Sequence, residues 1–426
     1  MTRNAIESII ALIKREVVPA IGCTEPAAVS LAVAKATELL GSVPEKIVLK
    51  LSGNIIKNAM GVGIPGTGMI GLPIAVALGA LVGKSEYGLE VLKDVDEYWV
   101  EAGRRYISEG RISVLHKPDA PSNLHIEVEV EGTDGKRAKA VISESHQNFI
   151  YLRCEDEVLL DSCAREEVKE DEDDIKLSAS MVYEFAMTAP LEDIRFILEA
   201  KKLNSDAADV GMQGHYGHGL GMTLLQSDGL IGNSPLDRIM ARTSAACDAR
   251  MGGAPIAVMS NSGSGNQGIT ATMPVVTYAE EIEADEEHTA RALILSHLTS
   301  IYIKQSLGRL SALCGCVVAS TGASAGLVYL MGGDFSKICA AIKNMVANLT
   351  GMICDGAKPA CAMKISSGVA TAVMSAMLAM NGKCVTSSEG IISDDIDITI
   401  HNLTSIGREA MTETDKLVLK IMVEGK

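Results

Sequence analysis

The sequence predicts an α+β fold, in which an N-terminal region containing an antiparallel sheet precedes a mostly helical C-terminal domain. Between residues 111 and 160 the pattern is that of strands, and the segment 124–131, LHIEVEVE, alternates with a period of two, as in a half-exposed antiparallel strand. From about Leu177 onward, apolar residues recur at helical spacing instead. We therefore expect an α+β region at 1–170 and a helical domain at 171–426.

The composition fits such a protein and limits its partners. The chain has 426 residues, which suits two or three domains, and only 3% are aromatic against 47% that are hydrophobic. Small aliphatic residues are therefore expected to fill the space between closely packed helices. The net charge of -16, without any cluster of Lys and Arg, argues against nucleic acid or an anionic membrane as a partner. The composition does not exclude a homodimer.

The N-terminal segment and the cysteine content indicate a reducing compartment. In AIESIIALIKREVV the apolar residues share one helical face, and Glu7 interrupts the run that an export signal would need. Ten cysteines without an export signal favour the cytoplasm, and metal binding or catalysis over disulfides. The long uncharged stretches 58–83, 251–279 and 310–333 are interrupted by glycines, so we expect buried turns and helix starts there, not membrane spans.

A helix is predicted to start directly after Cys23. Thr24 suits the N-cap, Pro26 the first turn, and Gly41 the position after the last turn. A thiol just outside a helix N-terminus is expected to have a lowered pKa, because the dipole and free amides favour the thiolate, although Glu25 partly opposes this. Cys23 is therefore a candidate reactive thiol, and a buried spacer thiol is the alternative.

Two glycine-rich loops of similar make predict two walls of one small-molecule site. The first holds Ser52-Gly53-Asn54 and runs into GVGIPGTGMIGLP, and the second, NSGSGNQG at 261–268, repeats the Ser-Gly-Asn triplet. Amides and hydroxyls in such loops suit the carboxylate and amine of an amino acid, whereas neither spacing matches a nucleotide-binding motif. A tight buried turn is the alternative for the first loop. The candidate substrate-binding residues are Ser52, Asn54, Lys57, Asn58, Ser262, Ser264 and Asn266.

Five of the ten cysteines lie between residues 314 and 361, and four of them stand among glycine, proline and small residues. These four occur in LCGCVVASTGAS and ICDGAKPAC, whereas Cys339 lies in an apparent helix. Gly356 and Pro359 argue against a continuous helix, so their segment is expected to wrap a bound group. Soft thiolates on irregular backbone are what a metal cluster requires, and ordinary buried thiols are the alternative.

Several of these motifs together resemble one known family. Cys23-Thr24-Glu25-Pro26, the first Ser-Gly-Asn loop, NSGSGNQG and the segment from Cys354 to Cys361 are similar to those of the L-cysteine desulfidases, relatives of the α part of iron–sulfur-dependent L-serine dehydratases. The resemblance covers nearly the whole chain. It implies a [4Fe-4S] cluster held by three cysteines, and no pyridoxal phosphate.

The resemblance also suggests which cysteines hold the cluster. Leu330-Met331-Gly332-Gly333 is similar to the turn that follows the first ligand in the dehydratases, and counting back from it favours Cys314, with Cys316 as the alternative. Cys354-Asp355 is similar to the later Cys-Asp pair, although the last two ligands are closer together here. The expected ligands are Cys314, Cys354 and Cys361.

The resemblance implies β-elimination from L-cysteine, giving pyruvate, ammonia and sulfide. Three thiolates would leave one iron open to act as a Lewis acid on the substrate, and Cys23, if it is a thiolate, is the candidate base. Lys358 beside the ligands is expected either to offset the negative charge of the cluster or to be solvated. The alternatives are an L-serine dehydratase with the same chemistry, a non-catalytic iron–sulfur redox sensor, and a pyridoxal-phosphate lyase, for which no lysine has a convincing Schiff-base setting.

Overall fold

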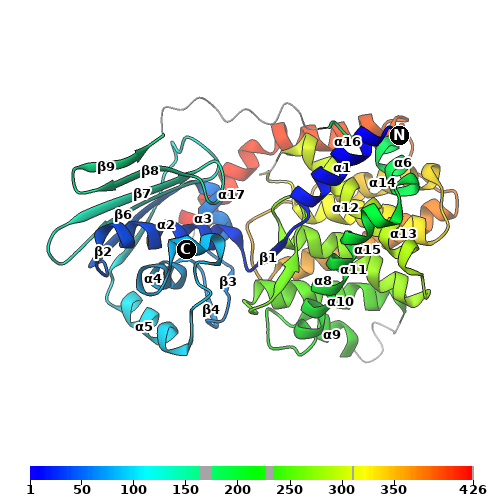
Figure 1. Ribbon diagram of the computed structural model, residues 1–426. Helices are drawn as coiled ribbons and strands as arrows, with labels where there is room; N and C mark the ends of the chain where they lie inside the picture. The colour runs from blue at the N-terminus through cyan, green and yellow to red at the C-terminus, as the bar shows by residue number, and fades with distance from the viewer. Residues whose placement is uncertain (163–174, 227–233, 309–310, 425–426) are drawn as a thin grey trace.

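The computed structural model describes residues 1–162, 175–226, 234–308 and 311–424. They form two lobes that lie side by side (Figure 1). The sheet lobe consists of residues 22–162, and the helical lobe of residues 1–21 with the described part of 175–411. The predicted α+β class is confirmed. The expected boundary near residue 170 falls in 163–174, outside the described residues.

The sheet lobe is built on six strands in the order β5-β2-β6-β7-β8-β9. Neighbouring strands pair antiparallel, except β2 with β5, which are parallel, so the sheet is mixed. The apolar residues of the predicted alternation, Ile126, Val128 and Val130, are buried in one core with helix α2 (Thr24–Leu40). The strands are β2 (Lys46–Leu51), β5 (Ile112–His116), β6 (His125–Glu131), β7 (Arg137–Ser143), β8 (Phe149–Cys154) and β9 (Glu157–Asp161).

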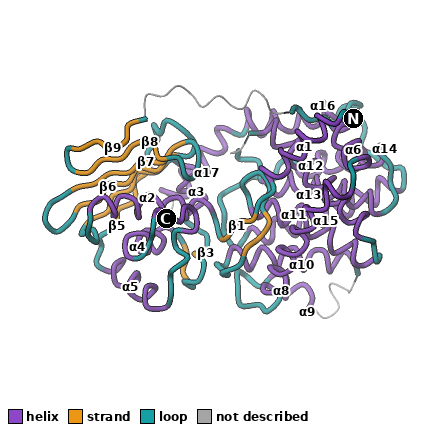
Figure 2. Tube along the Cα trace, viewed as in Figure 1, coloured by secondary structure: helices purple, strands orange, loops and turns teal. Residues whose placement is uncertain are grey.

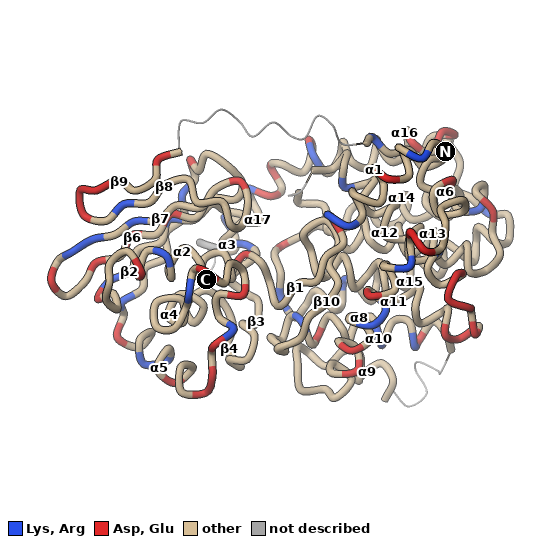
Figure 3. Tube along the Cα trace, viewed as in Figure 1, with Lys and Arg blue, Asp and Glu red and all other residues tan. Residues whose placement is uncertain are grey.

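Charged residues lie along the strands of this sheet (Figure 3). Because successive strand residues point to opposite sides, those that alternate with the buried apolar residues lie on the opposite face. Glu127 on β6 accepts hydrogen bonds from Lys139 at 2.6 Å, Lys117 at 3.0 Å and Lys50 at 3.4 Å. His125, whose Nε2 lies 3.9 Å from Oε2 of Glu127, holds the pKa of Glu127 well below its usual range together with these lysines, although burial opposes the shift. This ion-paired cluster explains how a carboxylate with a nearly buried side chain is tolerated on the sheet.

Short helices complete the sheet lobe, and α4 packs between α2 and α5. A proline in the first turn starts α4, and Asp96 caps α5 by accepting a hydrogen bond from the backbone of Trp99. The remaining elements are α3 (Gly53–Ala59), β3 (Gly63–Ile64), β4 (Met69–Ile70), α4 (Leu72–Leu81), η1 (Ser85–Glu90) and α5 (Glu97–Ser108).

In the helical lobe, the uncharged helix α13 packs against α11, α12, α14 and α15. Its glycines allow this, since a Cβ at Gly322 would lie 2.2 Å from the backbone oxygen of Ser296 on α12. The helices are α6 (Ala179–Thr188), α7 (Leu191–Ile194), η2 (Arg195–Ile197), α8 (Leu198–Gly211), α9 (Leu220–Gln226), α10 (Pro235–Met251), α11 (Gly265–Glu281), α12 (Glu286–Leu307), α13 (Gly315–Leu330), α14 (Phe335–Leu349), α15 (Cys361–Met380), α16 (Ile396–Ser405) and η3 (Ile406–Ala410).

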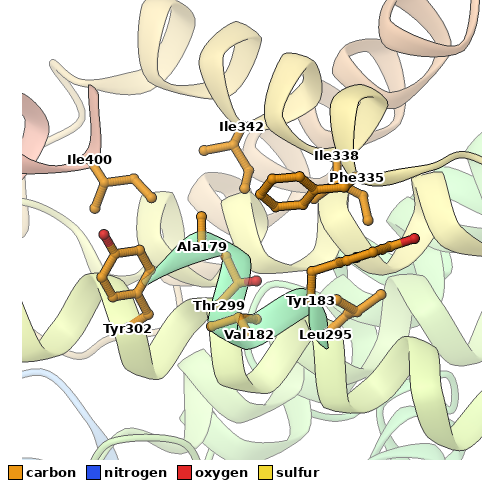
Figure 4. A pocket seen from close by; sticks show the side chains of 10 residues that line it. All are labelled: Ala179, Val182, Tyr183, Leu295, Thr299, Tyr302, Phe335, Ile338, Ile342 and Ile400. Atoms are coloured by element: carbon orange, nitrogen blue, oxygen red, sulfur yellow. The ribbon is translucent and has the colours of Figure 1, made fainter. Parts of the chain in front are cut away.

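One of these helices, α15, is the only one in the described ranges long and apolar enough to cross a membrane, judged by length and composition. In the fold, 56% of its apolar window is buried inside the protein, as expected for a core helix. The core around α6, α12, α14 and α16 leaves one small gap of about 10 Å³, bordered by the rings of Tyr183, Phe335 and Tyr302 (Figure 4). Such a volume holds no more than about one water molecule, so it is a packing defect and not a ligand site.

The two ends of the chain cross between the lobes (Figures 1 and 2). Helix α1 (Arg3–Glu16) packs on α12 of the helical lobe, and β1 (Pro19–Ile21) pairs antiparallel with β10 (Ala257–Met259). At the other end, α17 (Thr412–Glu424) leaves the helical lobe and packs on α3 of the sheet lobe. Cys23 therefore follows a strand that is held by the helical lobe.

Candidate active site

Cys23 is the N-cap residue of α2, one position earlier than the expected N-cap at Thr24. Its thiol donates a hydrogen bond to Oε2 of Glu25 at 2.8 Å and lies 3.9 Å from the backbone oxygen of Asn58. The hydroxyl of Thr24 donates to the same Oε2 at 3.2 Å, and the side-chain amide of Asn58 donates to Oε1 at 3.2 Å. Three uncharged donors therefore hold the carboxylate of Glu25.

The expected lowering of the Cys23 pKa is wrong. Burial, followed by the charge of Glu25, raises the pKa of this thiol well above its ordinary value, and the Arg250 guanidinium opposes the shift only in part. A thiolate here would lose its hydration and face a carboxylate two residues away, which outweighs the favourable helix N-terminus. At neutral pH, Cys23 is a thiol that donates to Glu25.

Arg250, which the sequence analysis missed, joins the Cys23 segment to the second glycine-rich loop. Its Nη2 donates to the backbone oxygen of Gly22 at 2.8 Å, and its Nη1 donates to Oδ1 of Asn266 at 3.0 Å. Gly265 makes room for it, since a Cβ there would lie 2.3 Å from Nε of Arg250. The side chain is buried and has no carboxylate partner among the described residues. No sequence signal marked it, because a single arginine near the end of a helix is usually solvated.

The first glycine-rich loop lies where the two lobes meet. A Cβ at Gly63 would lie 2.5 Å from the backbone carbon of Gly252 in the helical lobe, and one at Gly22 would lie 2.7 Å from the ring of Pro65. Ser52 is the N-cap of α3 and donates to the backbone oxygen of Asn123 at 2.7 Å. Gly63 permits a close approach of two backbones, so the alternative of a tight buried turn describes it better than a contact to a bound amino acid does.

A short antiparallel bridge brings Cys314 and Cys354 together. Leu313 pairs with Ile353, the backbone N–H of Cys314 donates to Met352 at 3.0 Å, and that of Cys354 donates to Ala312 at 2.6 Å. The hydrogen bond between the two thiols holds the pKa of Cys354 below its ordinary value and raises the pKa of Cys314. Two segments that are forty residues apart in the chain thus present adjacent sulfurs.

Cys361, the first residue of α15, lies close to this pair. Burial and the neighbouring Cys354 raise the pKa of Cys361. Cys316 faces α15 instead, where its thiol donates to the backbone oxygen of Lys364 at 3.1 Å. Cys247 on α10, also missed by the sequence analysis, is within electrostatic reach of both Cys361 and Cys316. Its segment, SAACDAR, gave no signal because a lone cysteine in a helix is normally a core residue.

Lysines from both lobes surround the cysteine pair. Lys57 of α3, which is 3% exposed, and Lys364 of α15 both lower the pKa of the Cys354 thiol, after the larger effect of the Cys314 hydrogen bond. Lys57 also forms an ion pair with Asp415 of α17. Gly356 has a φ of +93°, and a Cβ there would lie 2.0 Å from the backbone oxygen of Lys57. The cysteine loop is therefore packed directly on the helix that carries Lys57 and Asn58.

Lys358 and Lys364 hold the carboxylate of Asp355, which follows Cys354. Burial opposes the shift, but the hydrogen bonds from these lysines lower the pKa of Asp355 to about 2. Lys358 is thus engaged with Asp355 and not with solvent alone. The second glycine-rich loop also reaches this region, since a Cβ at Gly315 would lie 2.5 Å from Oε1 of Gln267.

A cavity of about 720 Å³ lies between the lobes, a size typical of small-molecule sites. Of the predicted substrate-binding residues, Asn54, Asn58 and Ser262 line it. Ser264 caps α11, and Asn266 accepts a hydrogen bond from Arg250. Like Ser52, these two residues do not line the cavity. Lys57 reaches Asp415, which is a lining residue. Glu25 also lines the cavity, whereas Cys23 does not.

The cysteines fit a thiolate-bound cluster better than a single ion. Within the described ranges, no three His, Cys, Asp or Glu side chains are arranged to hold one metal ion. The donor set of Cys314, Cys354 and Cys361 is nevertheless soft, largely buried and faced by lysines, as an anionic iron–sulfur cluster requires. Cys339 lies elsewhere, on α14, where Cys384 is the nearby thiol.

Comparison with known proteins shows the family of this chain. The family model described as the serine dehydratase alpha chain matches residues 86–420. The chain belongs to the serine dehydratase α-chain family. It is 59% identical to a UPF0597 protein of Bacteroides fragilis over 424 residues, which cover 99% of each chain. It is 61% identical to a UPF0597 protein of Phocaeicola vulgatus over 419 residues, covering 98% of this chain and 97% of the other.

The part that matches the serine dehydratase α chain contains the second glycine-rich loop and the cysteines at 314–361, but it begins after the first loop. The assignment of Cys23, Glu25 and the α3 residues to the same site therefore rests on the contacts described above. The names of the relatives state no reaction.

Proposed function

We propose that the protein is an iron–sulfur-dependent β-eliminating lyase that converts L-cysteine to pyruvate, ammonia and sulfide in the cytoplasm. The observation that carries this proposal is the position of α3. Its Asn58 binds the Glu25 carboxylate on one side, and its Lys57 packs on the cysteine loop through Gly356. Helix α3 therefore contacts both Glu25 and the cysteine loop, and its Asn54 and Asn58 line the cavity.

In this proposal Cys314, Cys354 and Cys361 hold a [4Fe-4S] cluster. The cluster would supply Lewis-acid activation of the bound amino acid at an iron that has no protein ligand. Lys57 and Lys364 offset the negative charge of the thiolates. Cys316 is less suited as a ligand, because its thiol donates to the backbone of α15.

The remaining residues bind the substrate and handle protons. Asn54, Asn58 and Ser262 present amide and hydroxyl groups to the cavity, where they suit the carboxylate and amine of an amino acid. Ser52, Ser264 and Asn266 do not line the cavity and instead stabilise the segments around it through hydrogen bonds. Cys23 and Glu25 form the proton-transfer pair that acts on the Cα proton.

L-Serine is the second candidate substrate, and the match to the serine dehydratase alpha chain favours it. The two substrates differ only in the leaving atom, so the same binding groups serve both.

The test is an anaerobic assay of the cluster-reconstituted protein with L-cysteine and L-serine side by side. Pyruvate measured with both substrates, and sulfide measured with L-cysteine, gives the ratio of the two kcat/KM values. We expect L-cysteine to be preferred. A higher value for L-serine would make the protein a dehydratase, and the absence of pyruvate from both would overturn the proposed activity.

A further inference from the structure

We propose that Glu25 is the residue that removes the Cα proton, and that the Cys23 thiol is its positioning partner. This inference rests on the proposed β-elimination. It assigns the role of base, for which the sequence suggested Cys23, to Glu25, because the carboxylate lines the cavity and the thiol does not. A base must come within hydrogen-bond reach of the proton that it takes, and Glu25 alone of the pair borders the space where a substrate can bind.

Four carboxylates line the cavity, and Glu25 is the one suited to this role. Glu16 accepts a hydrogen bond from Arg15 at 3.2 Å, and Asp415 is paired with Lys57. Glu144 is exposed to solvent. A carboxylate paired with a cation gives up that attraction when it takes a proton, and a solvated one is free to turn away.

Among the described residues, the hydrogen-bond donors to the Glu25 carboxylate are all uncharged. The thiol of Cys23 and the hydroxyl of Thr24 fix Oε2, while the amide of Asn58 fixes Oε1. The backbone that leads into Cys23 is itself held in place, because Arg250 binds the preceding Gly22 and β1 is paired with β10. The thiol therefore restricts the carboxylate to one orientation along the cavity wall.

With Glu25 as the base, every proton and electron pair of the elimination is accounted for. The Cα–H proton passes to an oxygen of Glu25, and its electron pair forms the Cα=Cβ double bond. The Cβ–S bond breaks, and the leaving group departs with the bonding pair as hydrogen sulfide anion. Glu25 ends as a carboxylic acid and later returns its proton to water. The 2-aminoacrylate that is released hydrolyses to pyruvate and ammonia.

Three variants separate the two roles, each as cluster-reconstituted full-length protein with its iron content and circular dichroism checked. Glu25→Gln keeps the shape and should lower kcat by about 10²–10⁴-fold, the usual contribution of a positioned base. Cys23→Ser keeps a hydrogen-bond donor and should stay within about tenfold of the original protein. Glu38→Gln, on the same helix and hydrogen-bonded to Ser85, is the matched control and should leave kcat unchanged.

Chemical rescue provides a readout that a structural defect would not move. Added formate should restore part of the turnover of Glu25→Ala, because a small carboxylate can enter the space left by the side chain, and it should not rescue Cys23→Ala. Turnover of Glu25→Gln within about threefold of the original protein would overturn the assignment. So would a Cys23→Ser protein as inactive as Glu25→Gln, since that result makes the thiol the base. An original protein without pyruvate formation would instead refute the proposed reaction itself.

Discussion

The ion pair between Lys57 and Asp415 is the clearest test of how the C-terminal helix α17 is held on the sheet lobe. The Lys57 side chain is 3% exposed and that of Asp415 is 27% exposed. Loss of the partner charge is therefore more costly for Lys57 than for Asp415. Removing Asp415 leaves a buried ammonium without a counter-charge. Removing Lys57 leaves a carboxylate that water can still reach.

We therefore expect an asymmetric effect. Breaking a buried pair costs about 3–5 kcal/mol, and the partial exposure of Asp415 lowers this to about 1–3 kcal/mol for Asp415→Ala. Lys57→Met should cost less than about 1 kcal/mol, because it also removes the desolvated charge. A double-mutant cycle of the two measures their coupling.

Hydrogen–deuterium exchange of α17 peptides in the cluster-free protein is the appropriate assay, because detachment of this helix is a local opening. Asp415→Ala should speed exchange by about 5- to 150-fold, the equivalent of about 1–3 kcal/mol. Glu413→Ala, which breaks the exposed pair with Lys416 on the same helix, should change it by less than about threefold. Equal effects of Asp415→Ala and Lys57→Met would refute the reasoning from burial.

Three further predictions concern the cluster loop and the sheet. Cys354→Ala should abolish iron and sulfide incorporation on reconstitution, whereas Cys339→Ala should not. Full iron content in the Cys354→Ala protein would show that Cys354 is not a cluster ligand. Gly356→Ala should lower thermal stability by about 1–3 kcal/mol because of its φ of +93° and the α3 backbone 2.0 Å from the new Cβ, while Gly351→Ala, with nothing within 4 Å, should be neutral. The depressed pKa of Glu127 means that its stabilisation is fully present above the ordinary carboxyl pKa of about 4 and declines as the pH falls from there towards the much lower pKa of the folded state, so Glu127→Gln should lower Tm more at pH 7 than at pH 3. An unchanged difference in Tm across that range would contradict the role of the carboxylate charge.

The elements that could be predicted were those with strong local periodicity. The strand at 125–131 and the helices after residue 177 follow from alternation and helical spacing, which reflect how one face of each element is buried. The helix after Cys23 was also predicted, with its start displaced by one residue. The segments that carry Asn54, Asn58 and Ser262 were marked by glycine and polar residues, and the structure brings these three to one cavity. The expected loop at Asn54 and Asn58 is wrong, because these residues lie on helix α3.

Other features depend on contacts between residues far apart in the chain. The pKa of Cys23 rises because of burial beside Glu25, which sequence neighbours alone did not reveal. Arg250 and Cys247 had no local signal, because their roles depend on hydrogen bonds, that of Arg250 to Gly22 and that of Cys247 to Asn266. Local sequence specifies which segments are helices, strands and turns, because those preferences act over a few residues. Only the packing of the two lobes decides which thiol faces a carboxylate and which side chain faces the cavity, because desolvation and charge pairing depend on the whole surroundings of a group.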